Sequence, residues 1–304
     1  MYKPTPEEVA KVKGLGFLID KNTMAHFNGR VLTVNGKISA DKMAVIAEAS
    51  KKYGSGECAF TTRQTVEIQH IPYENIQPLI EYLAQYDLEI GGTGPKVRPV
   101  VSCKGTTCQY GLIDTFSLSE KIHNVFYKGY HDVKLPHKFK IAVGGCPNNC
   151  VKPDLNDLGI IGCKKPVFDL EKCRGCKVCQ IEKACPVKSA KLIDGKITLN
   201  ECNGCGRCDG KCPFGAVADF ERGYRVYIGG RWGKKTATGR PLNKIFKSEE
   251  EVMNLVENAI LFFRDKGEAG ERFADTIKRI GFEKTEKILV SGEMLSRKDE
   301  ILAK

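Results

Sequence analysis

Two cysteine runs of the same design constrain this 304-residue chain more than any other feature. Each run has three cysteines separated by two residues and closes on a Cys-Pro pair. The runs comprise Cys173, Cys176, Cys179 and Cys185, followed by Cys202, Cys205, Cys208 and Cys212. In a doubled pattern of this kind, three cysteines of one run and the last cysteine of the other hold each 4Fe–4S cluster. The predicted ligand sets are Cys173, Cys176, Cys179 and Cys212 for one cluster, and Cys202, Cys205, Cys208 and Cys185 for the other.

The doubled pattern is the signature of a bacterial two-cluster ferredoxin. Zinc is the alternative, because C-x2-C pairs also bind zinc, but eight cysteines in two runs closed by Cys-Pro favour clusters. The first run has five residues between Cys179 and Cys185, where three are usual. A short loop there is tolerable, because Cys185 serves the other cluster. Gly175, Gly204 and Gly206 stand beside the cysteines, where they let the backbone curl around a cluster.

The expected cellular compartment decides how the cysteines are interpreted. The N-terminal sequence has no apolar segment typical of a secretory signal, and no run of about 18 apolar residues could span a membrane. We therefore expect a cytoplasmic protein, where disulfides are rare and clustered cysteines bind metal. Cys58 and Cys163 lie outside the cluster motifs and are expected to be inert packing residues.

The charge indicates anionic ligands. The chain has 48 basic and 37 acidic residues, a net charge of +11. Nucleic-acid binding is one interpretation of such an excess, but the basic residues are dispersed and no nucleic-acid motif occurs. We therefore predict no nucleic-acid partner, and expect the positive groups to hold an anionic cofactor or a small oxyanion.

A second set of cysteines has a different spacing and carries a family resemblance. Cys103 and Cys108 are separated by four residues, and Cys146 and Cys150 are the first and last residues of the sequence CPNNC. With TTRQTVEIQHI at 61–71 and LPHKFK at 135–140, this set resembles the nitrite and sulfite reductase family over essentially the whole chain. The resemblance implies a third 4Fe–4S cluster on these four cysteines, joined to sirohaem through the thiolate of Cys150.

The resemblance also implies roles for other residues. Arg63, Lys138 and Lys140 match three of the family's four anion-binding positions and are the predicted catalytic residues; Lys138 and Lys140 would alternate on a strand and share one face. Sirohaem carries eight carboxylates, so its pocket needs cations, although a solvated surface position is the alternative for each basic residue. The predicted cofactor-binding residues are Arg30, Arg98, Lys104, Thr106, Thr107, Asn148, Asn149, Cys150, Arg231, Lys234 and Lys235.

The fourth anion-binding position departs from the family pattern. The family has two arginines separated by one residue before a glycine turn, whereas RVLTVNG places Arg30 at the first and Leu32 at the second. Either Arg30 or Lys37 substitutes, or the substrate is not ordinary sulfite. His137, next to Lys138, is a further proton-relay residue to consider, with a structural role as the alternative.

The predicted fold class is α+β, with a ferredoxin-like sirohaem half-domain and a sirohaem/4Fe–4S domain that carries an inserted ferredoxin module. The predicted divisions are 1–90 for the half-domain, 91–162 and 220–304 for the sirohaem/4Fe–4S domain, and 163–219 for the insertion. Helices are expected at 5–13, 40–53, 74–86, 117–127 and 271–280. One more helix is expected to begin after Ser248, which would form a capping box with Glu251. Strands are expected at 29–34, 65–71 and 223–230.

The resulting functional prediction is a sirohaem-dependent sulfite reductase that takes electrons from an external donor protein through its ferredoxin clusters and the Cys150 thiolate. Nitrite reduction to ammonia on the same cofactors is one alternative, and a non-catalytic electron carrier is another. Full-length relatives have two pseudo-repeats that build the pocket, and this chain has one. We therefore expect a homodimer or higher homo-oligomer to complete the site.

Overall fold

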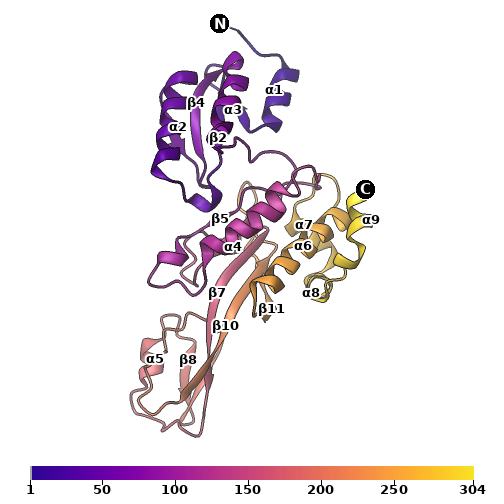
Figure 1. Ribbon diagram of the computed structural model, residues 1–304. Helices are drawn as coiled ribbons and strands as arrows, with labels where there is room; N and C mark the ends of the chain where they lie inside the picture. Colours follow the sequence, from indigo (N-terminus) through magenta and orange to yellow (C-terminus); the bar gives the residue numbers. More distant parts are fainter. Residues whose placement is uncertain (1) are drawn as a thin grey trace.

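The computed structural model describes residues 2–304. Figure 1 shows three parts along the molecule: an N-terminal unit, a central domain, and a small module at the end of a long two-stranded ribbon. No helix in this described range is long and apolar enough to cross a membrane.

The N-terminal unit is a four-stranded antiparallel sheet, in the order β1-β2-β4-β3, covered by helices. Its strands are β1 (Phe17–Ile19), β2 (His26–Val31), β3 (Cys58–Phe60) and β4 (Val66–Pro72). Its helices are α1 (Pro6–Gly14), α2 (Ala40–Tyr53) and α3 (Ile76–Ala84), with short 3-10 turns η1 (Val34–Gly36) and η2 (Tyr73–Asn75). The helix predicted at 40–53 is confirmed with the same bounds. Ser39 caps its N-terminus, because the Ser39 hydroxyl accepts a hydrogen bond from the Lys42 N–H.

The predicted alternation of strand 65–71 fails at one position. Strict alternation would place His70 on the same face as Val66 and Ile68, but Ile71 is the buried residue and His70 is half-exposed. His70 has a φ of 55°, and the register between β2 and β4 shifts beside it. This β-bulge moves the next apolar side chain into the core.

The central domain is a mixed five-stranded sheet in the order β11-β10-β7-β6-β5. Its strands are β5 (Val101–Ser102), β6 (Ile141–Gly144), β7 (Leu158–Phe168), β10 (Val217–Ile228) and β11 (Arg240–Phe246). The pairs β5–β6 and β6–β7 are parallel, and the other two are antiparallel. Short turns connect these strands: 3-10 helices η3 (Gly105–Thr107) and η5 (Pro153–Leu155), with α4 (Thr115–Ile122) continuing into the π-helix η4 (His123–Lys128).

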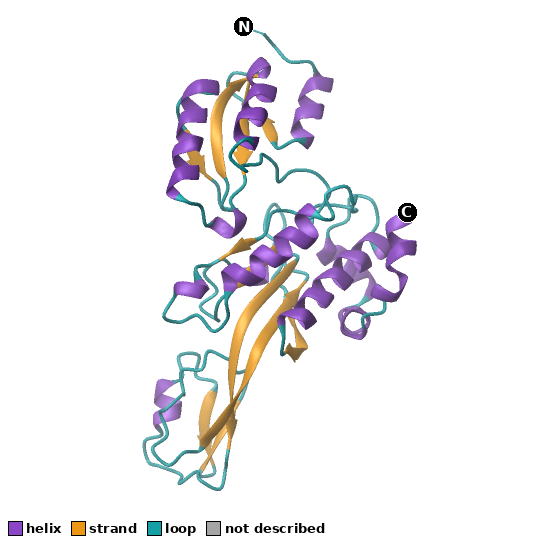
Figure 2. Cartoon of the chain, viewed as in Figure 1, coloured by secondary structure: helices purple, strands orange, loops and turns teal. Residues whose placement is uncertain are grey.

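Helices at the C-terminal end pack against this sheet (Figure 2). They are α6 (Glu249–Lys266), α7 (Phe273–Ile280), α8 (Phe282–Ser291), η6 (Leu295–Arg297) and α9 (Lys298–Ala303). Two final helices were predicted, and α8 and α9 were missed. The expected capping box at α6 is half present: Ser248 accepts from the Glu251 N–H, but the Glu251 carboxylate accepts from Lys247 instead.

The long ribbon is formed by β7 and β10, which pair from Leu158 opposite Ile228 to Phe168 opposite Val217. The predicted insertion boundaries at 163 and 219 both fall inside this ribbon, so the module is a continuation of the central sheet at its base. Beyond the ribbon, the module contains α5 (Gln180–Ala184) and a hairpin of β8 (Ala190–Ile193) and β9 (Lys196–Leu199). A small core of Ile181, Ala190 and Ile197 packs against several of the cysteines.

Candidate anion and iron–sulfur sites

Lys138 and Lys140 are placed by the buried ring between them. Phe139 is fully buried and lies 5.0 Å, centroid to centroid, from Phe273 at the start of α7. The backbone here is extended, but it pairs only through an isolated parallel bridge between Phe139 and Val97. The prediction that Lys138 and Lys140 lie on a strand is therefore wrong, although the chain is extended there. Because neighbouring side chains of an extended chain point to opposite faces, burial of Phe139 turns both lysines the other way.

Arg63 reaches the central domain from a turn of the N-terminal unit. Its guanidinium Nη2 donates to the Pro99 carbonyl at 2.7 Å, and Nη1 donates to the Asn156 Oδ1 at 3.1 Å. The next residue, Gln64, exchanges two hydrogen bonds with the backbone of Ser102, at 2.6 and 3.0 Å. The TTRQ turn is therefore fastened to β5, and Arg63 is held rigidly.

We expect Gln64→Ala to lower the free energy of unfolding by about 1–3 kcal/mol, because it leaves the buried backbone groups of Ser102 without partners. Thermal or denaturant unfolding would measure this. The matched control is Gln77→Ala, whose side chain bonds Glu81 on the exposed face of α3 and should change stability far less. Equal effects of the two substitutions would contradict this account of the turn.

Two residues that sequence reasoning missed complete the cluster. Asp157 is fully buried just before β7, and its carboxylate accepts from the Lys140 N–H at 2.9 Å. Arg272, 6% exposed, donates through Nη2 to both oxygens of Asp157 at 2.9 Å. One sequence signal existed: Arg272 caps the N-terminus of α7, where the helix dipole disfavours a cation. Nothing in the sequence distinguished Asp157.

The pKa values of these cations are lowered by burial and by neighbouring positive charge. Burial, followed by Arg63, Arg272 and Lys138, lowers the pKa of Lys140 to about 8. Burial and the neighbouring Arg98 lower the pKa of Arg63 to about 10. Burial and a nearby positive charge both disfavour the protonated form of a basic group, so they lower its pKa. The site therefore holds an excess of positive charge that an anion would relieve.

The same cluster extends to Arg98, Lys138 and His137. Burial lowers the pKa of Arg98 to about 10 and lowers the pKa of Lys138, and Arg272 contributes in both cases. Burial and Arg272 also lower the pKa of His137, whose Nδ1 accepts from the Lys138 N–H at 2.8 Å. The three predicted catalytic residues and Arg98 are thus brought together, with Arg272 as the neighbour they share.

Neither proposed substitute for the missing arginine sits in the middle of this cluster. Arg30 donates to Glu67 across the sheet at 2.9 Å and reaches only Arg98, whose pKa it lowers. The ammonium of Lys37 lies 5.4 Å from the centroid of the Phe116 ring. Leu32 is 7% exposed and joins the core of the central domain.

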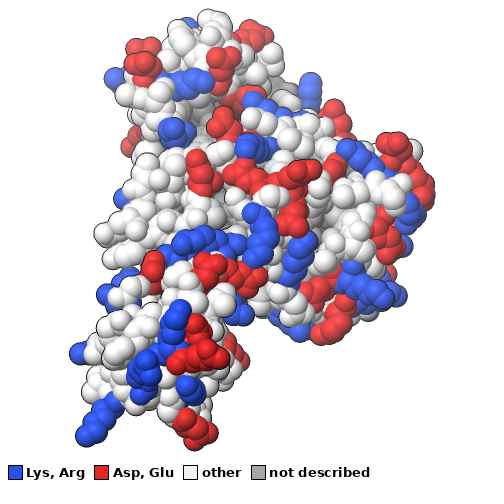
Figure 3. All heavy atoms as spheres, turned by 60° about the horizontal axis from the view of Figure 1, so that its bottom comes forward, with Lys and Arg blue, Asp and Glu red and all other residues white. Residues whose placement is uncertain are grey.

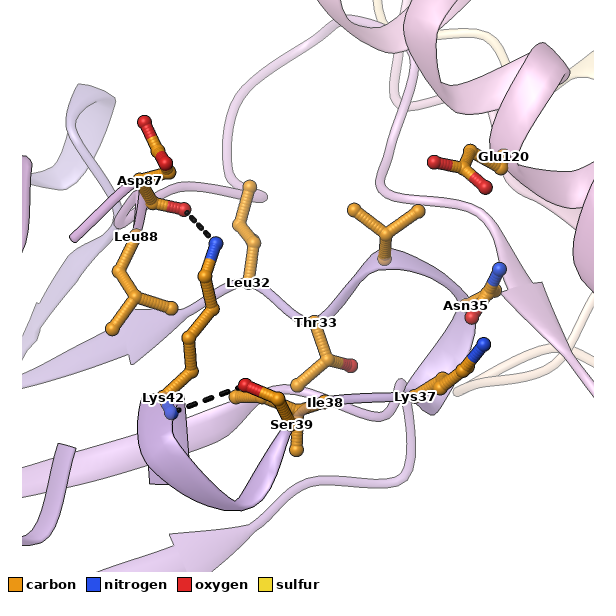
Figure 4. A pocket seen from close by; sticks show the side chains of 11 residues that line it. Leu32, Thr33, Asn35, Lys37, Ile38, Ser39, Lys42, Asp87, Leu88 and Glu120 are labelled. Atoms are coloured by element: carbon orange, nitrogen blue, oxygen red, sulfur yellow. Dashed lines mark hydrogen bonds between the residues drawn. The ribbon is translucent and has the colours of Figure 1, made fainter. Parts of the chain in front are cut away.

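One cavity lies away from these cations (Figure 4). It measures about 310 Å³ between the η1–α2 segment and α4, with Leu32 and Lys37 on one wall and Glu120 on the other. Lys42 donates to the Asp87 carbonyl across it at 3.1 Å. Leu32, found where the family pattern has an arginine, therefore faces a cavity that none of the clustered cations lines.

The cysteines of the first set approach one another at the ends of β5 and β6. Cys103 Sγ accepts from the Gly145 N–H at 3.1 Å. Burial, together with the proximity of Cys103, Cys150 and Cys108, raises the pKa of Cys146. Four thiols gathered this way fit the ligand set of a 4Fe–4S cluster.

Within the module, one cysteine of the first run lies beside three cysteines of the second run. Cys185, from the first run, lines one pocket with Cys202, Cys205 and Cys208. Burial raises the pKa of Cys208 to about 11, and those three thiols add to the rise. Gly175, Gly204 and Gly206 have φ values of 60°, 73° and 67°, as the curling backbone requires.

The other predicted set consists of Cys173, Cys176, Cys179 and Cys212. Three of these, Cys173, Cys179 and Cys212, pack against the module core. Within residues 2–304, no three Cys, His, Asp or Glu side chains converge on a single metal ion. A lone zinc ion needs sulfurs about 2.3 Å away, whereas a cube of four irons and four sulfides holds its cysteines further apart.

Cys146 and Cys205 line a common pocket of about 220 Å³ between the two cysteine regions. Arg207 of the module stacks over Tyr110 of the central domain, 4.7 Å from the ring centroid. The set containing Cys205 is therefore the module set that lies beside the first set. The leftover cysteines differ: Cys163 is buried as expected, but Cys58 is exposed, so its packing role is wrong.

Most of the remaining predicted cofactor residues lie at the surface. Lys104, Thr106, Thr107, Asn148, Cys150, Lys234 and Lys235 are exposed. Thr106 is engaged in the fold, since its hydroxyl donates to Asp114 at 2.7 Å. Arg231 donates to Asp275 at 2.8 Å. Asn149 donates to Asp154 at 2.7 Å, and its Oδ1 is buried without a partner. Figure 3 shows Lys and Arg interspersed with Asp and Glu over the face viewed.

Comparison with known proteins gives two family matches. The model described as "Nitrite and sulphite reductase 4Fe-4S domain" matches residues 93–297. The model described as "Nitrite/Sulfite reductase ferredoxin-like half domain" matches residues 20–86. The first range contains the first cysteine set and all of the clustered cations except Arg63, which lies in the second range.

Individual relatives agree. A coenzyme F420-dependent sulfite reductase of Methanocaldococcus jannaschii is 32% identical over 82% of this chain and 40% of its own length. One component of an anaerobic sulfite reductase of Salmonella typhimurium is 30% identical over 76% of this chain and 72% of its own. A crystal structure of dissimilatory sulfite reductase I shares the fold, with a TM-score of 0.68 at 20% identity, covering 86% of this chain and 68% of that one. The chain thus spans under half of the first relative.

Proposed function

Because this chain belongs to the nitrite and sulphite reductase family, we propose that it catalyses the six-electron reduction of sulfite to sulfide. The observation that carries the proposal is a cluster of five cations near a single buried carboxylate, Asp157. Arg272 is buried, and the other four are half-buried: Arg63, Arg98, Lys138 and Lys140. A small, highly charged oxyanion is the ligand such a cluster fits.

The donor sets support the proposed cofactors. The cysteines at 103, 108, 146 and 150 would hold one 4Fe–4S cluster, and the two crossed sets of the module, proposed as a ferredoxin insertion, would hold two more. Arg98, one of the predicted cofactor-binding residues, lies in the same cluster and suits a carboxylate of sirohaem. When bound, the sirohaem and its clusters supply the electrons for sulfur reduction.

The side chains of the chain itself manage charge and protons. Hydrogen sulfite takes up six electrons and six protons to give HS⁻ and three waters, so every departing oxygen needs proton donors. Lys140, with a pKa near 8, is protonated at neutral pH yet gives up its proton readily, as a general acid should. Arg63 cannot donate easily and instead holds the anion in place, because its other arms are fixed on Pro99 and Asn156.

The arrangement favours a site shared between two copies. Lys140 directly precedes β6, and Gly145 separates the end of β6 from Cys146. Lys140 and Cys146 are therefore six residue steps apart, about 20 Å along an extended chain at about 3.3 Å per residue. A compact site that uses both groups would draw the cations from one copy and the cysteines from a partner. A symmetric homodimer forms two such sites.

Anaerobic purification followed by turnover assays tests the proposal. We expect visible absorption bands of an iron tetrahydroporphyrin and reduced-viologen-dependent formation of sulfide from sulfite. Faster turnover of nitrite would favour the nitrite alternative. A colour due to iron–sulfur clusters alone, with turnover of neither anion, would contradict the proposal and favour an electron carrier.

A further inference from the structure

Arg272 occupies the middle of the cation cluster although no part of the family resemblance pointed to it. It contributes to the lowered pKa of Arg63, Arg98, Lys138 and Lys140, so it lies near all four. It comes from the start of α7, far along the chain from the other members. No other cation among residues 2–304 has this shared position.

Asp157 accepts hydrogen bonds from only one nitrogen of the Arg272 guanidinium. Nη2 donates to both oxygens of Asp157, while Nε is buried and has no hydrogen-bond partner. An unpaired buried N–H of a charged group is costly, and a native structure rarely leaves one without a purpose. Only 7% of the side chain is exposed, so bulk water does not readily serve it.

Charge balance argues against a purely structural ion pair. Asp157 contributes one negative charge at most, against five cations. Burial raises its pKa and Arg272 counteracts that rise. If Arg272 existed only to neutralise Asp157, an apolar pair of similar volume would be at least as stable and would spare the other four cations a neighbour of like charge.

We propose that Arg272 is an anion-binding residue of this site, taking the charge role left open by Leu32, and that Asp157 is the positioning residue for Arg272 and Lys140. This inference rests on the proposed function for the identity of the anion as sulfite. Asp157 orients Arg272 through both carboxylate oxygens and fixes the Lys140 backbone through one of them. The fourth cation thus comes from the C-terminal helices.

The test compares neutral, isosteric changes with the holoprotein. The double variant Asp157→Asn/Arg272→Gln removes both charges together, which avoids the uncompensated buried carboxylate that Arg272→Gln alone would leave. We expect its KM for sulfite, and its dissociation constant for radiolabelled sulfite in equilibrium dialysis, to rise at least tenfold, with kcat changed less. The Arg272→Lys variant should have a KM and a dissociation constant between those of the native protein and the double variant. Lysine keeps the positive charge but lacks the planar guanidinium that can donate two parallel hydrogen bonds.

Arg279→Gln on the same helix is the control, since its partner Glu271 lies outside the cluster, and it should bind sulfite like the native protein. Unchanged sulfite affinity in a folded double variant would overturn the inference while leaving the proposed function intact. Sulfite binding that depends on Arg272, in a holoprotein that turns over neither sulfite nor nitrite, would support the inference and reject the proposed function.

Discussion

Replacing Lys140 with methionine should lower kcat for sulfite at least about a hundredfold, the usual effect of losing a general acid. Methionine keeps the length and the apolar stem of lysine but removes the proton. The fold should survive, because the backbone N–H of Lys140, which bonds Asp157, is retained. Sulfide formation under anaerobic conditions measures the effect.

The pH dependence gives a second signature of the same residue. Burial and the facing Arg63, Arg272 and Lys138 lower the pKa of Lys140 to about 8, while Asp157 opposes them. Since the protonated form is the active one, kcat/KM should be level below pH 8 and fall about tenfold per unit above it. Lys140→Arg stays charged well above pH 8, so this alkaline fall should disappear, at a lower overall rate.

Lys244→Met is the matched control for the first substitution. Lys244 pairs with Glu251 at the surface, and its loss should leave turnover within about twofold of the native rate. Native turnover in Lys140→Met would remove Lys140 from the mechanism. An alkaline fall that persists in Lys140→Arg would assign the titration to another group.

Mixed dimers should recover activity from two inactive copies. Alone, Lys140→Met lacks the acid and Cys150→Ser lacks a cysteine of the first set, so each homodimer should be close to inactive. If cations and thiols come from different copies, a heterodimer of the two variants has one fully intact site. Differently tagged copies, purified as heterodimers, should show about half of the native turnover per dimer.

The control heterodimer distinguishes a shared site from an internal one. One copy is native and the other carries both Lys140→Met and Cys150→Ser. A site shared across the dimer leaves each pocket with one defect and no activity, whereas a site within one chain leaves the native copy working. An active control and an inactive mixed dimer would reject the shared site.

Sequence reasoning is most informative where a feature follows local spacing. The C-x2-C-x2-C runs and the Cys-Pro closures predict a crossed ligand pattern, and in the structure Cys185 lines one pocket with Cys202, Cys205 and Cys208. The helix at 40–53 was equally local, since a capping serine and an apolar face define it.

It failed where one residue depends on distant partners. The inward shift at Ile71 required knowledge of a bulge against β2, and the length of the ribbon required knowledge that β7 and β10 pair across the whole base of the module. Neither pairing is visible in the residues of a single strand.

By itself, the sequence determined family membership, because short motifs such as TTRQ, KFK and CPNNC carry the resemblance. The cluster ligands and the roles of Arg63, Lys138 and Lys140 are predictions made from such motifs. The tertiary structure alone decided that Asp157 and Arg272, 115 positions apart, form the centre of the cation cluster. It also decided that Leu32 is core, because burial and charge at a site are sums over elements that only folding brings together.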